Sequence, residues 1–131
     1  MGGLKTYVLG LLVAMICGTQ ALAAPDLSRD PARFFATCLG RFSATMEHEW
    51  LMGRDGEQAR DQRAMFETLL EAVAPDSALS RADILHMRIE AKFAQAKLLQ
   101  VASFHTDARQ KRYAAGLARR EIGSCAALLL G

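Results

Sequence analysis

The stretch DPARFFATCLGRFSATMEHEWLMG, residues 30–53, decides the fold class of this chain. Its large apolar side chains return every three or four positions, which is the spacing of one face of an α-helix. Asp30 suits the N-cap, Pro31 suits the first helical position, and Gly53 suits the C-terminal end, with Gly40 a mild cost inside the helix. The side chains expected to face inward are Phe35, Cys38, Phe42, Met46 and Trp50.

The same spacing predicts three further helices, at about residues 55–74, 81–104 and 107–130. Pro75 ends the first of these, because a residue before proline disfavours helical geometry. The expected inward residues of this helix are Met65, Phe66, Leu69, Leu70 and Val73. Those of the last helix are Ala114, Leu117, Ala118, Ile122, Cys125 and Leu129.

The helix expected at 81–104 begins after Ser80, which has the spacing of a capping box with Asp83. Two apolar lines run along it, so we expect it to be the most buried of the four helices. The first line is Leu85, Ile89, Phe93, Ala96 and Leu99 or Gln100. The second line is Ala91, Ala94, Leu98 and Val101.

Strand signals are nearly absent, since no segment alternates apolar and polar residues for long and β-branched residues are few. Four helices joined by short turns pack most simply with consecutive helices antiparallel. The sequence therefore predicts an all-α fold, a four-helix up-down-up-down bundle, in which residues 24–131 form a single helical domain after an N-terminal signal peptide.

The first residues have the pattern of a secretory signal. Lys5 supplies a positive charge, residues 7–17 form an apolar run, and small residues stand at the two positions of Ala21-Leu22-Ala23 that a signal peptidase reads. The run is too short to span a bilayer. We expect residues 1–23 to be removed, with cleavage after Ala23 or beside it at Ala24, leaving a periplasmic chain with no stable membrane insertion.

The charge balance argues against a nucleic-acid binder. The full chain has a formal net charge of +2, and removal of the signal takes away Lys5 and no acidic residue. A dedicated nucleic-acid binder needs a basic face that this composition does not supply.

Cys38 and Cys125 remain after signal cleavage, and an even count in an oxidising compartment indicates one disulfide. Cys38 lies near the start of the first helix and Cys125 near the end of the last. If these helices are antiparallel neighbours, both residues lie at a similar height and on inward stripes. The sequence predicts a Cys38–Cys125 bridge; the alternative is two buried free thiols.

The densest group of chemically capable side chains is MEHEWLM, residues 46–52. His48-Glu49 begins like the zinc-peptidase pattern H-E-x-x-H, but Met52 occupies the place of the second histidine, which excludes that class. Copper(I) accepts thioether and imidazole ligands, so His48, Met52 and His86 are candidate metal ligands. The alternative interpretation is that His48 and Glu49 are solvated.

Three parts of the chain resemble the corresponding parts of uncharacterised small exported helical proteins of photosynthetic-type alphaproteobacteria. They are the stretch 38–44 with Glu47, Trp50 and Leu51, the stretch 88–92, and Cys125. The resemblance implies a periplasmic location. It implies no activity, cofactor or functional residue.

No nucleophile motif, phosphate-binding loop or c-type haem motif is present, so we expect no catalytic residues and no cofactor. The sequence favours a non-enzymatic periplasmic protein that has an interaction or structural role and is stabilised by one disulfide. Its partner would be another envelope protein. The alternative is a periplasmic metal-handling protein that uses Met and His side chains.

Overall fold

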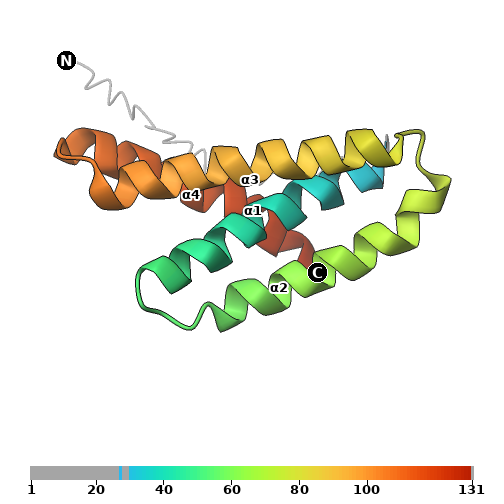
Figure 1. The fold of residues 1–131 in the computed structure, drawn as a ribbon, viewed down its shortest axis with the longest axis horizontal. Helices are drawn as coiled ribbons and strands as arrows, with labels where there is room; N and C mark the ends of the chain where they lie inside the picture. The colour runs from blue at the N-terminus through green and yellow to red at the C-terminus, as the bar shows by residue number, and fades with distance from the viewer. Residues whose placement is uncertain (1–26, 28–29, 131) are drawn as a thin grey trace, which may run out of the picture.

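The computed structural model describes residue 27 and residues 30–130. Most of this part is helical: α1 (Pro31–Leu51), α2 (Glu57–Val73), α3 (Arg81–Phe104) and α4 (Ala108–Leu129), with a short 3-10 turn, η1 (Ala74–Asp76), after α2. No strand occurs within the described residues. Consecutive helices run in opposite directions (Figure 1). The predicted all-α bundle is confirmed.

The predicted signal peptide, residues 1–23, and its cleavage site at Ala23 and Ala24 lie outside the described residues. Among the helices described, none combines the length and the apolar character that a membrane span requires.

Side chains before the first turns set where three of the helices begin. The carboxylate of Asp30 accepts a hydrogen bond from the Ala32 N–H at the start of α1, and Asp107 does the same for Gln110 at the start of α4. Ser80 and Asp83 cap each other at the start of α3, as the sequence predicts. These bonds satisfy N–H groups that have no partner inside a helix.

The first helix is the centre of the molecule. It packs along both α2 and α3, while α4 packs mainly along α3. In a closed square bundle α1 and α3 would be diagonal; here they are parallel neighbours (Figure 1). The first two-thirds of α1 are therefore buried on several sides. The buried residues there are Ala32, Phe35, Ala36, Cys38, Leu39, Gly40, Phe42, Ser43 and Ala44.

Gly40 permits the close contact between α1 and α3. A Cβ at this position would stand 2.2 Å from the carbonyl oxygen of Arg88 and 3.0 Å from the amide nitrogen of Lys92. Since real Cβ atoms do not approach backbone atoms so closely, only glycine fits. The residue that the sequence marks as a mild cost in α1 is the point where two helices touch.

Aromatic rings fill the contact between α1 and α2. Phe42 and Phe66 stack with ring centroids 5.6 Å apart, and the ring centroid of Phe35 lies 6.1 Å from that of Phe66. All three side chains are buried. Rings at such separations add to the free energy of burial, so this cluster is the main apolar core.

The prediction that α3 is the most buried helix is wrong. Only Ile84 and Gln95 are buried in it, and the expected inward residues Leu85, Ile89 and Phe93 are 53%, 42% and 69% exposed. The reason is that α1 covers one side of α3 and α4 covers another, which leaves Leu85, Ile89 and Phe93 of the first apolar line uncovered.

The predictions that Trp50 and Met65 face inward are also wrong. Trp50 is 52% exposed, because its indole N–H donates to the carbonyl oxygen of Asp55 in the α1–α2 loop. Met65 of α2 is half exposed and lies with Leu128 and Leu129 at the edge of the bundle, where α4 ends.

The last helix crosses from α3 to α2. Near its middle, Ala118 accepts a hydrogen bond from Gln95 of α3; further along, Cys125 is bonded to Cys38 of α1; near its end, Leu129 lines the same pocket as Leu69 of α2. Figure 1 shows this course behind α1. Because α4 crosses α1 obliquely, it leaves part of the groove between α1 and α3 open.

Candidate functional site

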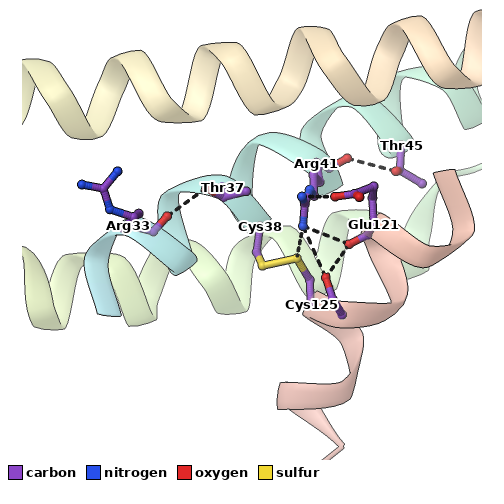
Figure 2. The surroundings of a disulfide bond; sticks show 8 residues. Arg33, Thr37, Cys38, Arg41, Thr45, Glu121 and Cys125 are labelled. Carbon is purple, nitrogen blue, oxygen red and sulfur yellow. Dashed lines mark hydrogen bonds and ion pairs between the residues drawn. A yellow bond between two sulfur atoms is a disulfide. The ribbon is translucent and has the colours of Figure 1, made fainter. Parts of the chain in front are cut away.

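A disulfide joins the two ends of the described chain. Cys38 of α1 and Cys125 of α4 are bonded through sulfur, with their Cα atoms 5.6 Å apart (Figure 2). Both residues are fully buried. The structure agrees with the pairing that helix height and inward direction predict, and not with two free thiols.

Arg41 is the polar partner of this bridge. It follows Cys38 by three positions, so both lie on the same side of α1. Its guanidinium forms an ion pair with the carboxylate of Glu121. It also donates to the carbonyl oxygen of Glu121 at 3.1 Å, to Ser124 Oγ at 3.3 Å and to Cys125 Sγ at 3.7 Å (Figure 2). The disulfide and the polar contacts of Arg41 thus join α4 to α1 at the same height along α1.

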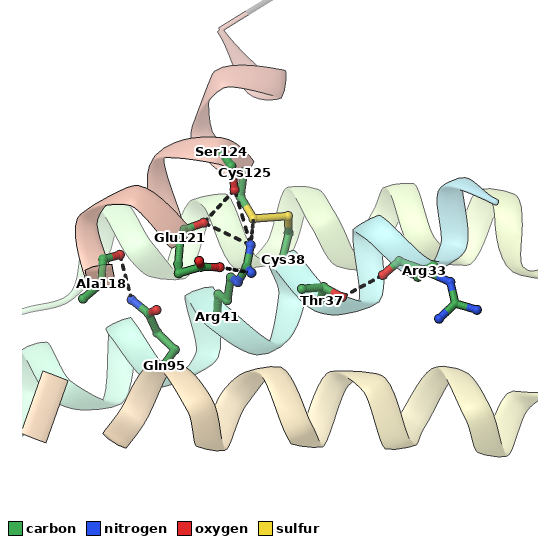
Figure 3. A network of polar contacts seen from close by, with 9 residues as sticks. All are labelled: Arg33, Thr37, Cys38, Arg41, Gln95, Ala118, Glu121, Ser124 and Cys125. Carbon is green, nitrogen blue, oxygen red and sulfur yellow. Dashed lines mark hydrogen bonds and ion pairs between the residues drawn. A yellow bond between two sulfur atoms is a disulfide. The ribbon is translucent and has the colours of Figure 1, made fainter. Parts of the chain in front are cut away.

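Gln95 is the polar residue buried between α3 and α4. Its side chain is 2% exposed, and its Nε2 donates to the carbonyl oxygen of Ala118 at 3.3 Å. Its Oε1 is buried and accepts no hydrogen bond from any described residue. Figure 3 shows this oxygen on the side that faces Arg41 and Glu121. A buried acceptor without a donor costs about 1–3 kcal/mol.

These residues line an open cleft of about 700 Å³ between α1, α3 and α4. Arg33, Thr37 and Arg41 form its α1 wall, while Leu117 and Glu121 form its α4 wall. The α3 wall is mostly apolar apart from the rim. Its residues are Met87, Glu90, Ala91, Ala94, Gln95, Lys97 and Leu98. We take this cleft as the candidate functional site.

The three candidate metal ligands do not come together. His48 lies beside the end of α3, where its Nε2 is 3.0 Å from Ser103 Oγ. His86 stands 17 positions earlier on the same helix, which corresponds to about 25 Å at the rise of an α-helix. It is exposed and pairs with Glu90.

Met52 is the C-cap residue of α1 and is 41% exposed, so it offers at most a two-ligand set with His48. In the described part of the chain, no three or more His, Cys, Asp or Glu residues group in a way that could hold a metal ion.

Two carboxyl groups, those of Glu49 and Asp83, have lowered pKa values. Neither group lines the cleft. The pKa of Glu49 is lowered, chiefly by the hydrogen bond from Arg54. The pKa of Asp83 is lowered by hydrogen bonds from the side chain and backbone of Ser80. Both shifts arise from structural contacts at helix ends, and we assign them no functional role.

Comparison of the chain with protein-family models, with curated proteins and with solved structures finds no match. The resemblance to exported alphaproteobacterial proteins stays an expectation.

Sequence reasoning missed Arg41 and Gln95. The signal for Arg41 was its position one turn after Cys38. The signal for Gln95 was a polar residue among the small and apolar residues Ala91, Ala94 and Leu98, where burial needs a specific reason.

Proposed function

We propose that this protein is a non-enzymatic periplasmic interaction protein that binds another envelope protein through the uncovered face of α3. Export is supported by the pattern of residues 1–23. A disulfide between Cys38 and Cys125 suits an oxidising compartment. Neither feature identifies the partner, so the argument for binding depends on the surface of the molecule.

The observation that carries the proposal is the stripe formed by Leu85, Ile89 and Phe93. These residues are four positions apart, so they lie along one side of α3. All three are large, apolar and more than two-fifths exposed. Contiguous apolar patches on a helix mark surfaces that bind other proteins more often than singly exposed residues do.

In-cell photo-crosslinking tests the proposal. A photo-reactive phenylalanine analogue is placed at position 93, and the matched control carries it at position 113. Tyr113 is a similarly exposed aromatic residue, but it lies on α4. We expect a discrete adduct with an envelope protein from position 93 and none from position 113.

Mass spectrometry of the periplasmic fraction checks localisation in the same cells, where the chain should begin at Ala24. Equal crosslinking from both positions would contradict the proposal. An adduct of the chain with itself would show that the stripe joins two copies, and would contradict binding of a different protein.

A further inference from the structure

The cleft between α1, α3 and α4 has features that the proposed interaction surface does not explain. It lies on another side of α3 from Leu85, Ile89 and Phe93, since none of these residues lines it. Its volume, about 700 Å³, falls in the range of small-molecule sites. An inference about the cleft therefore stands independently of the proposed function.

The first feature is an acceptor that lacks a donor. Gln95 Nε2 is fixed toward the carbonyl oxygen of Ala118, because only the amide nitrogen can donate there. Oε1 is thereby turned toward the side of Arg41 and Glu121 (Figure 3). Among the described residues nothing donates to it. An occupant with an N–H or O–H group would supply the missing donor.

The second feature is the charge of the cleft. Arg41 is paired with Glu121. Glu90 lies 3.2 Å from His86, which offsets the charge of this carboxylate only when the imidazole is protonated. Arg33 and Lys97 also line the cleft, and neither belongs to an ion pair in the described part of the chain. These two cations outnumber the carboxylate of Glu90, the other charged group of the lining outside the Arg41–Glu121 pair, and this balance favours an anionic occupant.

The third feature is the apolar wall between these cations. Side chains of α3 and α4 that lack any charge line the middle of the cleft, which suits an apolar body. They are Met87, Ala91, Ala94, Leu98 and Leu117.

We propose that the cleft binds a small organic anion that has an apolar body and one hydrogen-bond donor. The donor bonds to Gln95 Oε1, the anionic group is attracted by Arg33 and Lys97, and the apolar body covers Ala94 and Leu98. Binding is non-covalent.

The test uses 8-anilino-1-naphthalenesulfonate, which carries a sulfonate, aromatic rings and one N–H, and which fluoresces when it leaves water. We expect saturable one-to-one binding to the mature chain that weakens with added salt. The double variant Arg33→Gln with Lys97→Gln should weaken binding about fivefold or more. Gln95→Met should weaken it about three- to tenfold, because it removes the acceptor.

The matched control is Arg112→Gln with Arg120→Gln, which removes the same charge from exposed positions of α4 and should leave the affinity unchanged. Circular dichroism and cooperative unfolding confirm that each variant is folded. In a nitrogen-15 spectrum of the wild type, the side-chain amide of Gln95 should shift on titration.

Two results would overturn the proposal. One is that Phe93→Ser abolishes the fluorescence while the Arg33 and Lys97 variant retains it, since the probe would then bind the exposed stripe. The other is that the cleft variant and its control weaken binding equally, since the probe would then respond only to net charge.

Discussion

The α-carbon of Gly40 lies so close to the carbonyl oxygen of Arg88 that a Cβ would stand 2.2 Å from it. Gly40→Ala should therefore destabilise the fold by about 1–3 kcal/mol or more, because α1 and α3 must move apart. Urea unfolding of wild type and variant gives this difference in the free energy of unfolding.

Gly116 and Gly123 of α4 are the matched controls, since a Cβ there would meet nothing within 4 Å. Alanine at either position should stabilise the protein by about 0.5–1 kcal/mol through helix propensity. If Gly40→Ala behaved like these two, the close contact between α1 and α3 would not exist in solution.

Local signals in the sequence predicted much of the fold. Asp30, Ser80 and Asp107 start helices through bonds to residues a few positions away, so neighbouring residues suffice to find them. The disulfide between Cys38 and Cys125 could be predicted because position along a helix and direction around it both follow from residue count.

The uncovered stripe and the cleft could not be predicted in the same way. Periodicity shows that Leu85, Ile89 and Phe93 share a side of α3, but it does not show what covers that side. The cleft depends on the oblique crossing of α4, which the contact of Gln95 with Ala118 and the Cys38–Cys125 bridge help to set through tertiary packing. No local pattern encodes such a crossing.

Loss of the disulfide should loosen α4 more than the other helices. The bridge closes a loop with a sequence separation of 87 residues, for which the chain-entropy model gives up to about 4–5 kcal/mol. Cys38→Ala with Cys125→Ala should lower the free energy of unfolding by about 2–5 kcal/mol. Amide hydrogen exchange should accelerate most in the second half of α4.

Reduced wild type is the control, because it loses the covalent link but keeps both sulfur atoms. It should show the same pattern with a smaller loss of stability. Unchanged exchange in α4 in both proteins would mean that Arg41 and Glu121 hold this helix without the bridge.

Acid should weaken the start of α3. The pKa of Asp83 is lowered from 3.8 because its ionised carboxylate accepts hydrogen bonds from Ser80. A lowered folded-state pKa contributes stability that is present above the ordinary value and is lost as pH falls through the folded value. The pKa of Glu49, lowered from 4.5 by Arg54, acts in the same direction.

Thermal unfolding at about pH 6 and about pH 2.5 brackets this window. Ser80→Ala removes the hydroxyl donor and should destabilise by about 0.5–2 kcal/mol near neutral pH. The difference between variant and wild type should shrink in acid, because protonated Asp83 loses the charge that strengthens the Ser80 bonds. A difference that stayed constant with pH would contradict the role of the ionised carboxylate.

Gln95 separates stability from the binding that we propose for the cleft. Gln95→Met removes both the bond to Ala118 and the unpartnered Oε1, and the apolar side chain has a similar length. Since the free energy lost with the hydrogen bond and the free energy gained by removing the unpaired acceptor are of similar size, the free energy of unfolding should stay unchanged or rise by about 1 kcal/mol.

Gln95→Glu, which has the same shape as glutamine, should instead lower the free energy of unfolding by about 2 kcal/mol or more, because it buries a charge and removes the amide donor. Denaturant unfolding compares the two variants. If methionine destabilised as strongly as glutamate, Oε1 would have to be satisfied in the folded protein, and the argument for a donor-bearing occupant would lose its first step.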